Sequence, residues 1–140
     1  MKKHITTNNP QQTFQAGFQL AARLIGGAVV ALCGDLGAGK TVFAKGVAAG
    51  LGVADEVISP TFTLVRSYTC GAGVLHHFDT YRLADGEEAE EAGLAELIGA
   101  RDGISVIEWP ERIAGLIPSN AVWVRISKTG DDTREISIGE

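Results

Sequence analysis

The residues best suited to chemistry form one short segment, Gly34-Asp35-Leu36-Gly37-Ala38-Gly39-Lys40-Thr41. It matches the pattern G-x-x-x-x-G-K-[ST], in which glycines let several backbone N–H groups converge on an anion. In this pattern Lys40 places a positive charge on the β- and γ-phosphates of a nucleotide, and the Thr41 hydroxyl ligates Mg²⁺. The segment therefore predicts a phosphate loop; the alternative is a glycine-rich turn that binds no ligand.

Two carboxylates that follow apolar runs are expected beside this loop. Asp79 ends the run that begins at Val74, and Glu108 follows Ile104-Ser105-Val106-Ile107. In open α/β sheets, ligands bind beyond the carboxyl ends of the strands. Glu108 suits the role of holding Mg²⁺ directly or through water. Asp79 could orient or deprotonate the attacking water, or share the hydration shell of the metal. Which of the two contacts the metal first stays open, and an N-cap or a surface charge is the alternative for each.

Further residues are candidates for switching or for partner contacts. Ser59-Pro60-Thr61 could form a switch whose threonine hydroxyl binds the γ-phosphate or its Mg²⁺, and a turn fixed by the proline is the alternative. Trp109 could cover the nucleotide, meet a partner or simply pack. His77 shares a strand face with Asp79, and we expect a packed or hydrogen-bonded histidine there instead of a metal ligand.

The elements that must position these residues alternate between strands and helices. Apolar patterns predict strands at 4–7, 28–33, 63–69, 74–79 and 104–107, helices at 10–25, 41–49 and 86–98, and a hairpin of 122–126 with 134–138. Asn9 and Pro10 are typical of a helix start. The order predicts an α/β, three-layer phosphate-loop nucleotide-binding fold, with a mixed sheet that has a parallel core and antiparallel edge strands.

Composition narrows the class of protein further. We expect the 140 residues to form one domain, residues 1–140, because 45% hydrophobic and 21% charged residues are ordinary for a globular chain. The net charge of −5 argues against a broad nucleic-acid-binding face, since phosphate neutralisation needs clustered Lys and Arg. The two cysteines cannot build a disulfide framework. We expect no membrane span and no signal peptide, and hence a cytoplasmic protein.

The chain resembles the TsaE family, bacterial ATPases required for biosynthesis of the tRNA modification threonylcarbamoyladenosine (t6A). The resemblance is carried by four blocks in order, which are the phosphate loop, Ser59-Pro60-Thr61-Phe62-Thr63-Leu64-Val65, His77-Phe78-Asp79-Thr80-Tyr81-Arg82-Leu83 and Glu108-Trp109-Pro110-Glu111. The first block alone would indicate only a phosphate-loop protein. All four in a chain this short are specific for the family.

The resemblance implies an Mg²⁺-dependent ATPase with Lys40, Asp79 and Glu108 as its catalytic residues. Thr41 and Glu108 would hold Mg²⁺, and Asp79 would be needed for hydrolysis of ATP. Nucleotide contacts would come from Gly34, Asp35, Gly37, Ala38, Gly39, Lys40, Thr41 and Val42. Relatives commonly carry a Gly-Arg pair near the C-terminal hairpin, and Thr133-Arg134 stands in its place here, so that Arg134 is a further candidate contact.

The resemblance also implies protein partners, the TsaD–TsaB pair. In that family TsaD transfers the threonylcarbamoyl group onto adenosine 37 of tRNA. The ATPase binds the pair, and its hydrolysis of ATP is expected to drive or reset the cycle. The acidic balance of the chain agrees with a protein that works through protein partners instead of gripping tRNA itself.

Three other classes share the phosphate loop. A small-molecule kinase usually needs a lid with catalytic arginines, and the chain has no insertion of that size. A regulatory GTPase needs Asn-Lys-x-Asp and Asp-x-x-Gly motifs, and the chain has neither. A nucleotide sensor without turnover is the third, and the two strand-end acids weigh against it. ATP turnover without an acceptor, and the affinity for ATP against that for GTP, would distinguish these classes.

Overall fold

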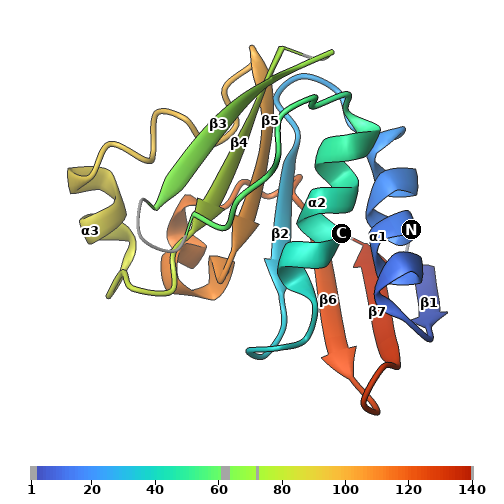
Figure 1. Cartoon of the computed structure of the whole chain (residues 1–140). Coiled ribbons are helices and arrows are strands. Elements are labelled where there is room, and N and C mark those ends of the chain that lie inside the picture. Colours follow the sequence, from blue (N-terminus) through green and yellow to red (C-terminus); the bar gives the residue numbers. More distant parts are fainter. Residues whose placement is uncertain (1–2, 61–63, 72, 140) are drawn as a thin grey trace.

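A seven-stranded sheet organises the part of the chain that the structure, a computed structural model, describes: residues 3–60, 64–71 and 73–139 (Figure 1). The strands are β1 Lys3–Thr7, β2 Val29–Cys33, β3 Val65–Cys70, β4 Gly73–Asp79, β5 Gly103–Glu108, β6 Val122–Lys128 and β7 Arg134–Gly139. The helices are α1 Pro10–Ala21, α2 Lys40–Gly50 and α3 Gly86–Glu91, and a 3₁₀ segment, η1, spans Pro110–Leu116.

The sheet has a parallel centre and antiparallel margins. Its strand order is β1-β7-β6-β2-β5-β4-β3, and β2 pairs in parallel with both β5 and β6, while β4 pairs in parallel with β5. The outer pairs β3–β4, β6–β7 and β1–β7 are antiparallel. Strands β2 and β5 are buried along their whole length, which explains their nearly continuous apolar sequences. The predicted mixed sheet is confirmed.

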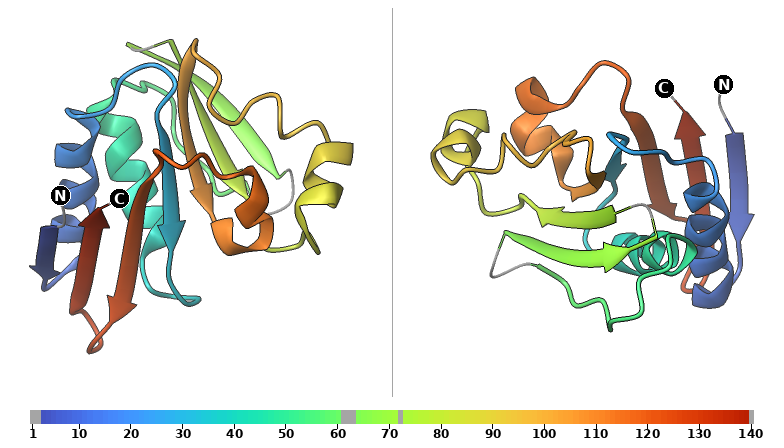
Figure 2. Two further views of the ribbon diagram at one scale, coloured as in Figure 1. Left: turned by 180° about the vertical axis from the view of Figure 1, so that it is seen from behind. Right: turned by 90° about the horizontal axis from the view of Figure 1, so that it is seen from above.

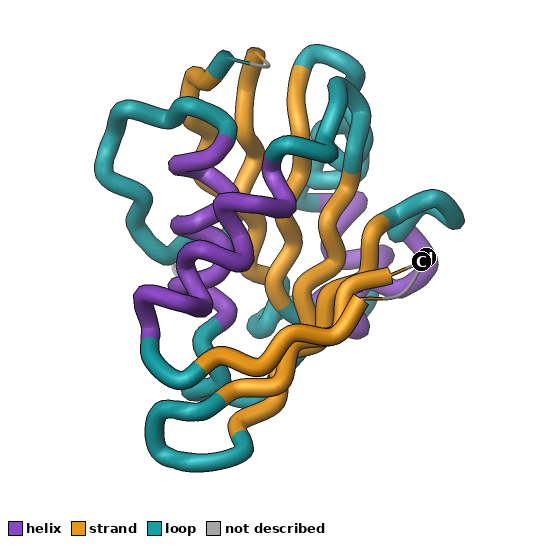
Figure 3. Tube along the Cα trace, turned by 90° about the vertical axis from the view of Figure 1, so that its right-hand side faces the viewer, coloured by secondary structure: helices purple, strands orange, loops and turns teal. Residues whose placement is uncertain are grey.

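Helical segments cover both faces of the sheet, so that the fold has three layers. Because side chains alternate along a strand, Val30 and Leu32 enter the core cluster that includes α1 and α2. Val29 and Ile107 enter a second cluster with residues of α3 and η1. The view from above in Figure 2 shows α1 and α2 on one face and α3 and η1 on the other. The tube in Figure 3 shows the strands lying between these helical layers.

Helices α1 and α2 touch through glycines. A Cβ on Gly17 of α1 would collide with the carbonyl oxygen of Phe43, and a Cβ on Gly46 of α2 would collide with that of Phe14. The buried side of α1 consists of small residues and one leucine: Thr13, Ala16, Gly17, Leu20 and Ala21. Close backbone approach therefore takes the place of large side chains between these helices.

Two predicted helices are shorter in the structure. The first begins as expected, with the Asn9 side chain accepting a hydrogen bond from Gln12 N, but α1 ends at Ala21 because the next N–H groups bond three residues back. Ile25, expected on the apolar helix face, is 77% exposed. The helix predicted over 86–98 is helical only over Gly86–Glu91, and Gly93 with φ 81° then turns the chain. Segment η1 was not predicted.

The C-terminal hairpin and the N-terminal edge strand form as predicted. Strand β6 pairs with β7 in antiparallel register, and β1 adds to the free edge of β7. Figure 1 shows β1 beside β7 at the lower right.

Among the described residues no helix has the combined length and apolar character that a bilayer crossing requires.

Candidate nucleotide site

The phosphate loop, residues 34–41, joins the end of β2 to the first turn of α2. Gly37 and Gly39 have φ of 79° and 102°, values that side-chain-bearing residues rarely adopt, so the loop needs glycine at both positions. Gly39 is the N-cap of α2 and has no side chain to occupy the N–H groups of the first turn. These N–H groups, at the positive end of the helix dipole, are suited to bind phosphate.

Lys40 is buried at the head of this helix, with 5% of its surface exposed. Its Nζ donates a hydrogen bond to the Gly34 carbonyl oxygen at 2.5 Å and lies 3.3 Å from the centre of the Trp109 ring. Burial lowers the pKa of Lys40, while the nearby carboxylates of Glu108 and Glu111 act in the opposite direction. The ammonium group is thus held by a neutral carbonyl and a ring, partners that a phosphate could replace with a full negative charge.

The two strand-end carboxylates lie side by side next to the loop. The register pairs Asp79 of β4 with Glu108 of β5, and Glu108 in turn with Leu32 of β2. Asp79 is 7% exposed and Glu108 is 3% exposed. An Asp79 oxygen, Oδ1, accepts a hydrogen bond from the Tyr81 N–H at 3.0 Å. The structure thus brings the loop, Asp79 and Glu108 together at one edge of the sheet, as expected for parallel strands.

Glu108 contacts two residues through different oxygens. Its Oε1 accepts a hydrogen bond from the Thr41 hydroxyl at 3.4 Å, and its Oε2 lies 2.7 Å from His77 Nε2. We expected a packed or hydrogen-bonded His77, and the structure confirms this. Its carboxylate partner was not predicted, because pairing a residue of one strand with one of the next requires the register.

Thr80 and Trp109 make contacts at the point where β5 ends. The Thr80 hydroxyl donates to the carbonyl oxygens of Glu108 at 3.1 Å and Trp109 at 2.6 Å. Trp109 has a left-handed backbone, φ 61°, and its ring lies 4.8 Å from that of Tyr81. Of the roles considered for Trp109, the structure shows packing, and its ring packs against Lys40 of the phosphate loop. Sequence reasoning did not single out Thr80.

Arg134 connects the C-terminal hairpin to the phosphate loop. Its Nε donates to the Ala38 carbonyl at 2.9 Å and its Nη2 to the Gly37 carbonyl at 3.3 Å. Because C=O and N–H point in opposite directions in a trans peptide, the carbonyl of Ala38 turned to Arg134 points the Gly39 N–H the other way. A small cavity of about 60 Å³ adjoins Arg134 and is also lined by Pro10, Thr13, Gly39, Val42 and Asp132.

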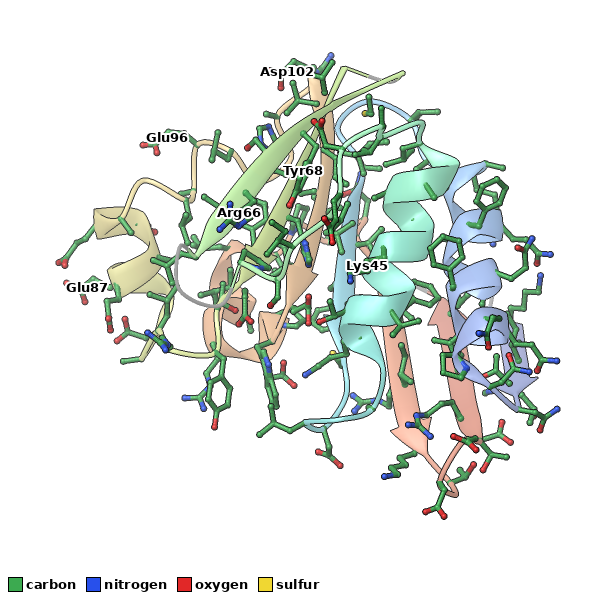
Figure 4. The ribbon with its side chains drawn as sticks, in the orientation of Figure 1. Lys45, Arg66, Tyr68, Glu87, Glu96 and Asp102 are labelled. Carbon is green, nitrogen blue, oxygen red and sulfur yellow. The ribbon has the colours of Figure 1, made fainter. Side chains whose placement is uncertain are left out.

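The candidate switch lies between α2 and β3. Ser59 is half-buried and Pro60 is buried, whereas Thr61 lies outside the described residues. The Pro60 carbonyl accepts from Leu64 N–H at 2.8 Å, and the Leu64 carbonyl accepts from Asp79 N–H at 2.9 Å. Figure 4 shows Tyr68 on β3 beside the segment before Ser59, where its hydroxyl bonds the backbone of Ile58. The segment is thus linked to the strand that carries Asp79.

The oxygen atoms at this edge suit Mg²⁺ better than a metal that needs a complete protein cage. Among the described residues, no group of three or more His, Cys, Asp or Glu side chains is arranged around a metal position. Mg²⁺ is usually held by one or two protein oxygens together with phosphates and water. The Thr41 hydroxyl and Glu108 Oε1, 3.4 Å apart, are oxygens of this kind.

The order of the sheet, the loop after β2 and the acids at the ends of β4 and β5 define a phosphate-loop protein of the three-layer α/β class. The family model described as "Threonylcarbamoyl adenosine biosynthesis protein TsaE" matches residues 7–136. The chain therefore belongs to the TsaE family, whose members take part in t6A biosynthesis.

Individual relatives agree with this assignment. The TsaE protein of Bacillus subtilis is 42% identical over 131 residues, which cover 94% of this chain and 81% of that protein. The TsaE protein of Treponema pallidum is 41% identical over 132 residues, covering 94% of this chain and 96% of that protein. The crystal structure of YdiB from Bacillus subtilis superimposes with a TM-score of 0.83 at 36% identity, covering 99% of this chain and 84% of that one.

Proposed function

We propose that this chain binds ATP with Mg²⁺ and hydrolyses it, and that it does so in the cytoplasm with the TsaD–TsaB pair during t6A biosynthesis. The observation that carries the ATPase proposal is the meeting of three strand ends. Lys40 and Thr41 follow β2, Asp79 ends β4 and Glu108 ends β5, and the register places these ends next to one another. The family membership carries the link to t6A.

Each group has a separate role in this proposal. The N–H groups of residues 37–42 and the Lys40 ammonium bind the phosphates, and Lys40 exchanges the Gly34 carbonyl for a phosphate oxygen. Thr41 and Glu108 would hold Mg²⁺, which supplies neutralisation of phosphate charge when bound. Asp79 would orient the attacking water or accept its proton.

The nucleoside end of ATP is expected on the hairpin side of the loop. The cavity that Arg134 shares with Val42, Thr13 and Pro10 adjoins Gly39 there. We infer that Arg134 acts mainly by holding the loop carbonyls, and that it reaches the nucleotide only from this cavity. The Ser59-Pro60-Thr61 segment remains a proposed switch because its Pro60 connects to the Asp79 strand through Leu64.

Two experiments test the proposal. Calorimetry with ATP and GTP, each with and without Mg²⁺, should show Mg²⁺-dependent binding that favours ATP; turnover without any acceptor would separate the ATPase from a kinase. Gel filtration with the TsaD–TsaB pair should give a complex that depends on ATP. Absence of heat with any purine triphosphate would refute nucleotide binding, and absence of the complex would refute the partner proposal alone.

A further inference from the structure

The buried histidine His77 is the closest side-chain partner recorded for the carboxylate of Glu108. The distance between His77 Nε2 and Glu108 Oε2 is 2.7 Å, and the two side chains are 1% and 4% exposed. A buried carboxylate without a hydrogen-bonding partner carries a large desolvation cost. The nearby ammonium group of Lys40 donates instead to the Gly34 carbonyl. His77 is therefore a main stabilising partner of Glu108 at this depth.

Strand register, not loop conformation, sets this contact. In the parallel pair of β4 and β5, His77 lies opposite Val106, and Asp79 lies opposite Glu108. Because side chains two residues apart share a strand face, His77 and Glu108 are diagonal neighbours on the face that α2 covers. Both strands are among the most deeply buried of the sheet, so the position of the imidazole is fixed by the core.

The two oxygens of the Glu108 carboxylate differ in the strength of their hydrogen bonds. His77 engages Oε2 at 2.7 Å, whereas the Thr41 hydroxyl lies 3.4 Å from Oε1. Strong hydroxyl hydrogen bonds are about 2.5–3.0 Å long, so the hydrogen bond from Thr41 to Oε1 is weak. The short bond to Oε2 limits rotation of the carboxylate and leaves Oε1 directed at Thr41, the other proposed ligand of Mg²⁺.

The second nitrogen of the ring indicates how the hydrogen is placed. His77 Nδ1 is buried and has no hydrogen-bond partner among the described residues. A ring with its hydrogen on Nε2 donates to the carboxylate and leaves Nδ1 as a bare acceptor. The opposite arrangement would bury an unpaired donor and turn a nitrogen lone pair toward the carboxylate oxygen. The contacts therefore favour the Nε2–H form.

We propose that His77 is a positioning residue for Mg²⁺ binding, which donates from Nε2 to Glu108 Oε2 and so directs Oε1 toward the metal beside Thr41. The inference rests on the proposed function of this site. His77 itself contacts neither metal nor nucleotide in this proposal. Residues that orient metal ligands in this way typically contribute about 10–100-fold to metal affinity.

The test compares three variants for the Mg²⁺ concentration that half-saturates binding of a non-hydrolysable ATP analogue. His77→Leu removes the donor, and His77→Gln keeps an N–H donor on a side chain of similar reach. The matched control is His76→Gln, since His76 is the adjacent buried histidine, on the other face of β4, where it bonds Ser67. Analogue affinity in EDTA is measured in parallel, because a positioning role should leave it unchanged.

We expect His77→Leu to raise the half-saturating Mg²⁺ concentration by about tenfold or more, His77→Gln to recover most of that loss, and His76→Gln to match the parent. An unchanged value in His77→Leu, or an equal rise in His76→Gln, would overturn the inference. If the parent itself binds no Mg²⁺–nucleotide, the proposed function fails and takes this inference with it. Normal binding by the parent and by all variants refutes only the inference.

A measurement on the unmodified protein covers the case in which His77→Leu does not fold. Ring ¹⁵N–¹H correlation spectra should show His77 with its hydrogen on Nε2. Its signals should shift when Mg²⁺ and the analogue are added, while those of His76 stay in place. A hydrogen on Nδ1, or signals of His77 that do not respond to Mg²⁺, would contradict the proposal.

Discussion

The parallel centre of the sheet and its wing, β6–β7–β1, share one core cluster with α1 and α2 but differ in the chemistry they carry. Strands β2, β5 and β4 run in one direction, so that their ends bring the phosphate loop, Glu108 and Asp79 to one edge. In the wing, the direction reverses at every pair from β6 outward, and strand ends alternate between the two edges. Parallel neighbouring strands therefore bring functional groups together at one end of the sheet, whereas antiparallel neighbours place them at opposite ends.

The wing contacts the backbone of the phosphate loop. Its side-chain hydrogen bonds to the phosphate loop come from Arg134, whose partners there are the carbonyl oxygens of Gly37 and Ala38. The centre faces the proposed phosphate position with side chains, whereas Arg134 of the wing bonds the loop backbone that carries the N–H groups. If this division is correct, substitutions in the centre should abolish binding or turnover, and substitutions in the wing should only weaken them.

The largest effect is expected from Lys40→Ala in the centre. The variant loses the ammonium that neutralises the phosphates, so nucleotide binding should be abolished in calorimetry. Its thermal unfolding should stay close to that of the parent, because the hydrogen-bond and ring partners of the buried ammonium are a neutral carbonyl and an aromatic ring. Retained ATP affinity in a folded variant would remove Lys40 from the site.

Asp79→Asn and Glu108→Gln should separate binding from turnover. Both changes keep the size of the side chain and remove its charge, so ATP should still bind, while turnover falls by about a hundredfold or more. Phosphate release measured at saturating ATP and Mg²⁺ checks this. Full turnover by either variant would contradict the role assigned to that carboxylate.

Arg134→Gln tests the wing. Losing the guanidinium bonds to the two loop carbonyls should weaken ATP binding by about tenfold, the equivalent of one charge-assisted hydrogen bond. The matched control is Arg125→Gln, because Arg125 is exposed on β6 of the same hairpin. Equal losses in both variants would indicate a general effect of hairpin charge instead of support for the loop.

Thr80→Val should have the smallest effect. The valine keeps the shape of the threonine and removes the hydroxyl bonds to the carbonyls of Glu108 and Trp109, which should lower the free energy of unfolding by about 1 kcal/mol. Denaturant unfolding measures this, with Thr80→Ser as the control that keeps the hydroxyl. A loss in Thr80→Ser as large as that in Thr80→Val would assign the effect to packing.

Local patterns were sufficient for most of the fold. The glycine pattern, the apolar runs and the Asn9–Pro10 start predicted the loop, the strands and α1, and the run around Gly130 predicted the hairpin. They failed at the end of α1, where the N–H groups after Ala21 bond three residues back, and in α3, where Gly93 turns the chain although the apolar spacing continues. Pattern alone does not reveal where a buried face stops.

The contacts within the candidate site were less accessible to sequence reasoning. Asp79 and Glu108 could be found because each follows an apolar run, and the end of a strand is a local feature. The pairing of His77 with Glu108 depends on register, and the contact of Arg134 with the loop joins residues 96 positions apart. Such pairs become visible only once the strand order is known.

The glycine contact between α1 and α2 has a consequence for where we expect the molecule to move. With backbone against backbone at Gly17 and Gly46, the two helices pack with no room for even a methyl group at these positions. We expect this packing to hold the first turn of α2, with Lys40 and Thr41, in place against α1. If the proposed ATPase cycle displaces part of the site, we expect the displacement on the opposite flank, where Pro60 is linked through Leu64 to Asp79.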